Sequence, residues 1–187
     1  MKPSEIKKGH VIRWQNELWR VVGSSHVQKG NWRSYYQLDM KNLKTGRVLT
    51  NRFATHEDIE YAEVDQRKMQ YLYRDGNHHC FMDSETFEQV MIPHDEIADQ
   101  VPYLKLNMEL VVQFVENQPV SIDLPSWVAL EVIETTPGVK GDTVSNVMKP
   151  AKLETGLEIK VPLHVNAGDI VKVDTRTGEF IERASTK

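Results

Sequence analysis

Two stretches of this 187-residue sequence combine glycine with basic side chains. The first is Q-K-G-N-W-R at residues 28–33, which adds a tryptophan ring, and the second is P-G-V-K-G-D-T at residues 137–143. Glycine lets a backbone approach a ligand closely, and basic and aromatic groups at the loop tips of small β domains hold RNA. Glycine and polar residues also make ordinary turns, so the sequence alone leaves both interpretations open for each stretch.

Residue types that carry acid–base, nucleophilic or metal chemistry do not form a recognisable site. His79 and Cys80 are neighbours on an expected strand and so point to opposite faces, whereas chelation from one strand needs ligands two residues apart. As a nucleophile, Cys80 would need a base and an electropositive setting, but its surroundings are acidic. No G-x-S-x-G, Walker A, G-x-G-x-x-G or H-E-x-x-H motif occurs. We therefore expect no catalytic residue, no metal and no cofactor, and a protein that is not an enzyme.

Charge is distributed unevenly along the chain, whose net charge is −4. Residues 1–64 hold 11 Lys and Arg against 7 Asp and Glu, residues 65–127 hold 4 against 11, and residues 128–187 hold 8 against 9. The basic first third can face phosphate while the acidic middle stays in solvent, although segments of this length also vary by chance.

Hydrophobic runs and cysteine content bear on the compartment. There is no apolar run of 18 residues and no secretory signal at the start, and the single cysteine excludes an internal disulfide. We expect a cytoplasmic protein with no membrane partner.

Short strands separated by turns account for almost the whole chain. Gln15-Asn16 separates two strand-like runs, and in residues 34–41 alternate positions share a face, which is the pattern of a half-buried strand. Thr45-Gly46 then turns the chain into the run 47–53. The sequence therefore predicts an antiparallel sheet in the first block.

The second block repeats this plan. Asp75-Gly76 between two strand-like runs predicts a hairpin whose two central residues have positive φ, and residues 116–118 predict another turn. Residues 93–101 are the one convincing helix, short and with acidic residues in its first turn.

A third block contains strands at 128–135 and 157–165 and a hairpin at 169–183 around Thr177-Gly178. The intervening stretch, residues 135–156, is polar and predicts a long loop. So many short strands with almost no helix predict an all-β chain of three small β-barrels, with domains at 1–64, 65–127 and 128–187.

Longer stretches of the sequence resemble bacterial elongation factor P. These are Y-L-Y-R-D-G-N-H-H-C-F-M-D-S-E-T-F-E-Q at 71–89 and nearly all of 132–183, including K-G-D-T, K-P-A and V-D-T-R-T-G-E. E-I-K-K-G-H-V-I-R-W-Q-N-E-L-W-R-V-V at 5–22 and L-K-T-G at 43–46 extend the resemblance over the whole chain.

This resemblance implies an SH3-like (KOW-type) domain followed by two OB-fold domains. It also implies a monomeric translation elongation factor that binds the ribosome between the exit and peptidyl sites. Such a factor positions peptidyl-tRNA and relieves stalling at consecutive prolines without being an enzyme. In the third domain, Gly141, Asp142 and Thr143 match the family's loop that approaches the mRNA codon in the exit site.

The expected hairpin tip, Lys29, Gly30, Asn31, Trp32 and Arg33, departs from the family pattern Pro-Gly-Lys-Gly. Aligned without gaps from Trp19 to Gly46, the family's reactive lysine falls on Asn31, whose amide offers no amine for modification. A shifted alignment matches Lys29-Gly30 instead but needs two inserted residues, and it would make Lys29 the fallback for modification.

In the ungapped alignment we expect an unmodified tip, with Lys29 and Arg33 on phosphates of the tRNA acceptor end. The Trp32 ring then stacks on a nucleotide or caps the barrel end. The departure also leaves open an RNA-binding regulatory protein that kept the fold without the ribosomal role.

Overall fold

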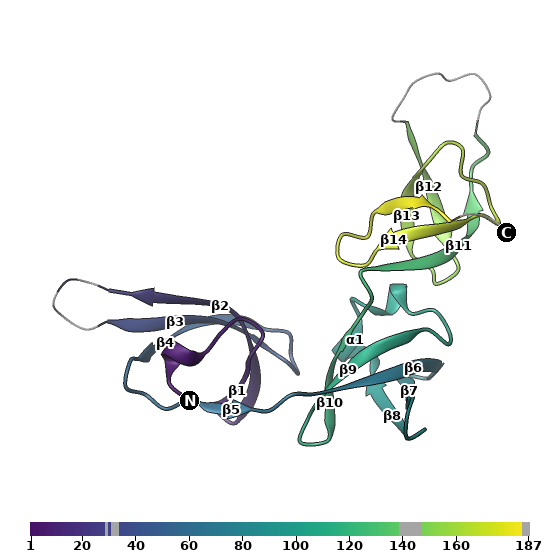
Figure 1. Ribbon diagram of the computed structural model, residues 1–187. Coiled ribbons are helices and arrows are strands. Elements are labelled where there is room, and N and C mark those ends of the chain that lie inside the picture. The colour runs from purple at the N-terminus through teal and green to yellow at the C-terminus, as the bar shows by residue number, and fades with distance from the viewer. Residues whose placement is uncertain (29, 31–33, 139–146, 185–187) are drawn as a thin grey trace. The chain divides into compact units, whose positions relative to one another are not determined.

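The structure is a computed structural model that describes residues 1–28, 30, 34–138 and 147–184 (Figure 1). Strands joined by short turns make up most of these residues, and they form three five-stranded antiparallel sheets. The chain divides into two compact units, Met1–Arg67 with Val112–Ser121, and Lys68–Val111 with Ile122–Lys187. Within the described ranges, no helix has the length and apolar character needed to cross a membrane.

The first sheet has the order β4-β3-β2-β1-β5. Its strands are β1 (Val11–Trp14), β2 (Glu17–Val27), β3 (Tyr35–Asn42), β4 (Val48–Ala54) and β5 (Glu60–Ala62), preceded by a 3-10 turn, η1 (Pro3–Glu5), that the sequence did not predict. The turn between β1 and β2 is confirmed, with φ values of 52° at Gln15 and 64° at Asn16. Two such residues give the backbone twist that suits a tight hairpin. Gly46 likewise has a φ of 72° in the predicted turn before β4.

Alternation along β3 builds the core of the first barrel. Leu38 and Met40 point inward and are fully buried, and they share the interior with Phe53 and Trp19. Trp19 also donates a hydrogen bond from Nε1 to the carbonyl of Trp14 at 3.1 Å. Burial of each large apolar side chain contributes about 1.5–3 kcal/mol, so this interior fixes the register of the strands.

The second sheet has the order β10-β9-β6-β7-β8. It is formed by β6 (Asp65–Asp75), β7 (His78–Asp83), β8 (Gln89–Pro93), β9 (Glu109–Val115) and β10 (Gln118–Asp123). Between β8 and β9 lie the helix α1 (His94–Ile97) and the 3-10 turn η2 (Val101–Tyr103). The predicted helix is therefore present but shorter than 93–101, ending as the chain turns into η2.

Two turns in this sheet differ in detail from the prediction. Asp75 is the last residue of β6 and pairs with His78, so Gly76 and Asn77 form the turn, and Gly76 supplies the positive φ of 56°. A positive φ at only the first central residue is the pattern of a type II′ turn, not of the expected type I′. The second turn consists of Glu116 and Asn117 alone, with φ values of 52° and 63°, because residue 118 already belongs to β10.

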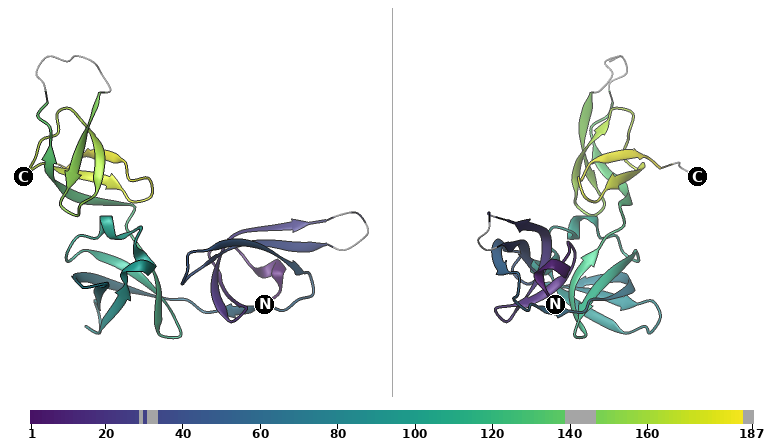
Figure 2. Two further views of the ribbon diagram at one scale, coloured as in Figure 1. Left: turned by 180° about the vertical axis from the view of Figure 1, so that it is seen from behind. Right: turned by 60° about the vertical axis from the view of Figure 1, so that its left-hand side comes forward.

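The third sheet has the order β13-β12-β11-β14-β15 and curls round its own interior (Figure 2). Its strands are β11 (Trp127–Thr135), β12 (Met148–Leu153), β13 (Glu158–Pro162), β14 (Ile170–Asp174) and β15 (Phe180–Arg183). Buried aliphatic side chains, among them Leu130, Val132, Leu153 and Val173, fill it.

The prediction of an uninterrupted polar loop over residues 135–156 is wrong, because β12 lies within it. This strand pairs with both β11 and β13, so it is internal to the sheet. Two features concealed it in the sequence. Pro150 is a residue type that argues against an internal strand, and the inward position 149 holds a lysine where alternation would call for an apolar residue.

Within each compact unit, parts distant in sequence pack together. In the first unit, Val115 joins Val11 and Ala62 in a small apolar cluster. In the second unit, Tyr103 and Met108 pack on the core of the third barrel, and Thr155 Oγ1 donates to the carbonyl of Pro102 at 2.5 Å. The domain boundaries 1–64, 65–127 and 128–187 stay a prediction, because the two compact units follow other divisions.

Candidate functional site

The long ribbon of β2 and β3 leads to the first predicted loop (Figure 1). The two strands are paired as far as Val27 and Tyr35, which places residues 28–34 between their ends. Gly30 is exposed and has a φ of 56°, as expected for a glycine that turns the chain. The other predicted tip residues, Lys29 and 31–33, lie outside the described residues.

Aromatic rings occupy the ribbon next to this loop. His26 and Tyr36 are register partners, and their rings stack with centroids 4.5 Å apart and an interplanar angle of 9°. Stacked rings at the end of a β-ribbon are groups on which an unpaired base can continue the stack. Sequence reasoning missed this pair, because its members lie in different strands and meet only through the register of β2 and β3.

Some of the basic side chains that give the first third of the chain its positive charge form ion pairs in the structure. Two cations of the first barrel are paired, since Arg13 lies 2.6 Å from Glu116 and 3.2 Å from Glu60, and Lys2 lies 3.0 Å from Asp58. The hydrogen bond to Glu116 raises the pKa of Arg13, and the hydrogen bond from Lys2 lowers the pKa of Asp58.

Other basic side chains of the first barrel remain exposed without an ion-pair partner among the described residues. These are Lys7, Lys8, Lys41, Lys44, Arg47 and Arg52.

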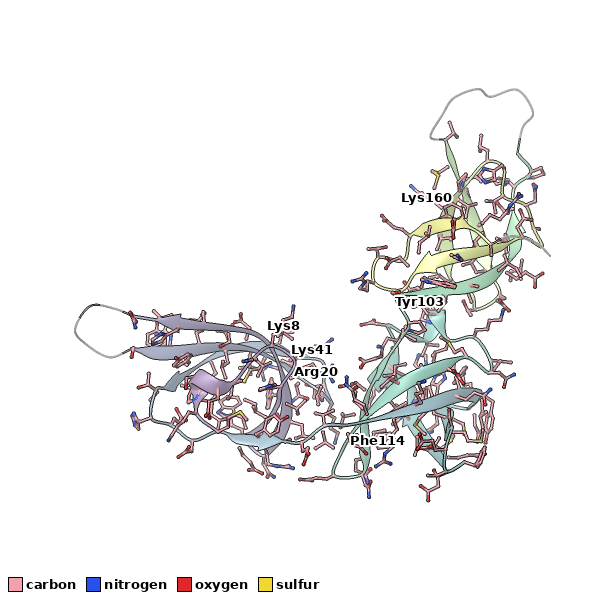
Figure 3. All side chains as sticks on the ribbon, in the orientation of Figure 1. Lys8, Arg20, Lys41, Tyr103, Phe114 and Lys160 are labelled. Carbon is pink, nitrogen blue, oxygen red and sulfur yellow. The ribbon has the colours of Figure 1, made fainter. Side chains whose placement is uncertain are left out.

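Arg20 lies beside this exposed positive charge (Figure 3). It is the register partner of Lys41. Lys8 is also close in the fold, because the next residue, Gly9, donates its N–H to the carbonyl of Val21, the residue after Arg20. The guanidinium of Arg20 donates to Gln113 Oε1 and, at 2.8 Å, to Ser121 Oγ. Arg20 therefore serves the packing of the first unit, and Lys8 and Lys41 stay available to an external phosphate.

The second predicted loop begins and ends on the third barrel. Gly141, Asp142 and Thr143 lie outside the described residues, but the chain on either side is held. Thr135 Oγ1 donates to the carbonyl of Pro150 at 2.8 Å, and Lys149 Nζ donates to the carbonyl of Thr136 at 2.5 Å.

Close packing adds to these hydrogen bonds at the start of the same loop. A Cβ at Gly138 would come within 2.5 Å of the carbonyl oxygen of Leu163, so only glycine fits there without displacing backbone. Lys149 is 5% exposed, which makes it a buried cation whose ammonium group fixes the chain next to the loop. Sequence reasoning placed Lys149 in the loop and did not assign it this function.

His79 and Cys80, the residues considered for metal binding, belong to the interior of β7. His79 Nε2 lies 3.0 Å from His94 Nδ1, with the two ring centres 5.3 Å apart, and Tyr71 Oη lies 3.0 Å from His79 Nδ1. Burial, followed by the nearby His94, lowers the pKa of His79. Cys80 Sγ lies 3.6 Å from Gln89 Oε1 and is also buried. Among the described residues, no three potential ligands gather into a metal site.

Comparison with protein families covers nearly the whole chain. Residues 2–59 match the elongation factor P KOW-like domain, residues 64–122 match the elongation factor P OB domain, and residues 128–183 match the elongation factor P C-terminal domain. The all-β fold class with a KOW-like first barrel, expected from the resemblance, is thereby confirmed.

Individual relatives agree with these matches. The chain is 43% identical over 182 residues to elongation factor P of Chloroflexus aggregans, with 96% of each chain covered. It is 44% identical over 180 residues to elongation factor P of Thermodesulfovibrio yellowstonii, again with 96% of each covered. Among solved structures, it is similar in fold to eukaryotic translation initiation factor 5A from Methanococcus jannaschii. That similarity has a TM-score of 0.52 at 17% identity and covers 66% of this chain and 90% of the other.

Proposed function

The chain belongs to the elongation factor P family of translation elongation factors, and from this we propose that it binds the ribosome near the exit and peptidyl sites. There it positions peptidyl-tRNA and promotes peptide-bond formation at stalling sequences such as consecutive prolines. The observation that carries the proposal is the match of all three family domains along one chain. The identity of 43% to one relative, with 96% of each chain covered, agrees with it.

The proposed site has two parts. Lys29 and Arg33 of the unmodified tip contact phosphates of the tRNA acceptor end, and Gly141, Asp142 and Thr143 approach the mRNA codon in the exit site. The exposed cations of the first barrel support the first part because phosphate contacts need positive charge that is not already paired. The hydrogen bonds of Thr135 and Lys149 next to residues 139–146 support the second part of the site, because a loop whose two ends are anchored can reach only a limited region.

Acceleration by such a protein needs no catalytic side chain. Holding two reactants in the right geometry can lower a barrier by as much as about 7–11 kcal/mol, through entropy lost in advance and solvent reorganisation avoided. We propose that the protein, acting as a cytoplasmic monomer divided at residues 64 and 127, supplies this orientation while the ribosome supplies the chemistry.

A second candidate function is RNA binding by a regulatory paralogue without the ribosomal role, which the departure of the tip from the family pattern favours. Sedimentation with ribosomes separates the two. The proposed function predicts that the protein pellets with ribosomes that hold peptidyl-tRNA and that free RNA in excess does not displace it. A protein that follows the free RNA and leaves the ribosomes would support the regulatory role instead.

A further inference from the structure

A groove of about 920 Å³ lies at the end of the first sheet, where β3 begins and β4 ends. Its lining includes Tyr35 and Arg52, Ala54 and His56 at and after the end of β4, and Gln28 and Gly30 after the end of β2. The volume is within the range of sites that hold small organic ligands. Its lining is an even mixture of polar and apolar groups, which suits a ligand that has both a flat ring and polar edges.

Tyr35 and Arg52 form a cation–π pair. The guanidinium carbon of Arg52 lies 5.0 Å from the centre of the Tyr35 ring, a cation–π contact between neighbouring strands. Arg52 is exposed, and no carboxylate among the described residues forms an ion pair with it. The contact holds the guanidinium over the ring, and its N–H groups remain able to donate to other acceptors.

The edge of β4 adds backbone hydrogen-bonding groups to the groove. The N–H of Ala54 bonds Glu57 Oε2 at 3.0 Å and its carbonyl accepts from the N–H of Glu57 at 3.0 Å, so both groups point away from β3. Residues two apart in an antiparallel strand direct their backbone to the same side. The N–H and carbonyl of Arg52 therefore also face outward along this edge, where the carbonyl accepts a hydrogen bond from Asn51 Nδ2 at 3.4 Å and keeps a second lone pair.

We propose that this groove binds one unpaired nucleotide of a single-stranded RNA segment. The base lies against the Tyr35–Arg52 pair, its polar edge meets the free edge of β4, and the Arg52 guanidinium donates to the adjacent phosphate. This inference rests on the proposed function for its RNA partner but assigns the stacking and phosphate contacts to Tyr35 and Arg52, which lie outside the tip residues 29–33. Glu57 offsets part of the positive charge at this corner, so stacking supplies more of the affinity than phosphate pairing.

Binding of a short single-stranded adenine RNA to the full chain, followed by fluorescence anisotropy, tests the groove. Replacing Tyr35 with leucine (Y35L) weakens binding about tenfold, the effect of losing one stacked base. Replacing Arg52 with glutamine (R52Q) lowers the slope of log affinity against log salt by about 0.7, the contribution of one phosphate contact on a single strand. An abasic sugar-phosphate strand of the same length is insensitive to Y35L.

Matched controls lie away from the groove and from the exposed cations of the first barrel. Tyr61 is exposed on β5 at the opposite edge of the first sheet, and Arg74 is exposed near the end of β6 in the second sheet. We expect Y61L and R74Q to change binding less than twofold. If the control variants lose as much RNA affinity as Y35L and R52Q, binding is not specific to the groove and the proposal is overturned.

Two readouts keep the test independent of variant folding and of the proposed function. In the unaltered protein, NMR signals of the His56 ring must shift on titration with RNA while those of His10 stay unchanged, and the opposite pattern overturns the proposal. Rescue of proline stalls by the unaltered protein is measured separately. Normal rescue together with equal RNA affinities of R52Q and R74Q refutes the groove alone, whereas groove binding without rescue refutes the ribosomal function alone.

Discussion

The buried His79 makes the stability of the protein depend on pH in a defined direction. Its ring is 1% exposed and lies between Tyr71 and His94, while Arg74 and His78 add positive charge nearby. These surroundings lower the pKa of His79 in the folded state. In the unfolded chain an ordinary histidine has a pKa of about 6.5.

The sign follows from proton binding. Below pH 6.5 the unfolded chain takes up a proton at His79 that the folded protein does not, so the unfolding free energy falls as the pH falls. The stabilisation is fully present above the unfolded pKa and is lost below it. For one such group, the loss reaches at most about 1.4 kcal/mol at pH 5.5.

Urea unfolding of the protein and of H79Q at pH 7.5 and pH 5.5 measures this loss. Both proteins lose stability through their other titrating groups, and the difference between the two losses isolates His79. We expect the unaltered protein to lose more stability than H79Q, by up to about 1.4 kcal/mol. H164Q, which changes a solvent-exposed histidine, is the control and should behave like the unaltered protein. Equal losses in the unaltered protein and H79Q would refute the reasoning.

Further predictions concern the two loops and their supports. Neutralising Lys29 together with Arg33 should reduce the slope of log ribosome affinity against log salt by about 1.4–1.8, as expected for two phosphate contacts, and an unchanged slope would place those contacts elsewhere. Changing Asp142 to lysine should lower rescue of proline stalls without changing the melting temperature, and undiminished rescue would exclude this loop from the site. K149M should alter the unfolding free energy by less than about 1 kcal/mol, because losing a charged hydrogen bond is offset by no longer burying an ammonium group, yet rescue should fall. A loss of stability above about 3 kcal/mol would contradict this balance. Mass spectrometry of the native protein should give the unmodified mass, and an adduct on Lys29 would support the shifted alignment.

The strands of the first barrel could be predicted because their signals are local. Gln15 and Asn16 accept positive φ, and the alternation that buries Leu38 and Met40 appears directly in the sequence. By contrast, β12 could not be recognised. Its inward Lys149 is accommodated by a carbonyl at Thr136, thirteen residues earlier, which no local pattern reveals.

The site was predictable to a smaller extent. Glycine and basic residues identified the two loops, the family resemblance supplied their expected partners, and Gly30 has the backbone conformation expected of it. The Tyr35–Arg52 pair was not foreseen, because its members lie in different strands and meet only through the register of β3 and β4. Sequence shows which residues can stack, whereas the pairing of strands decides which of them do.

The rate of peptide-bond formation on ribosomes stalled at consecutive prolines tests the central claim most directly. Stalled complexes are prepared without any elongation factor P, the protein is added, and the transfer of the nascent peptide to the next proline is followed in a single turnover. The account predicts a faster transfer at consecutive prolines, with little change at a template that lacks them. An unchanged rate at consecutive prolines, with the protein bound to the ribosome, would contradict it.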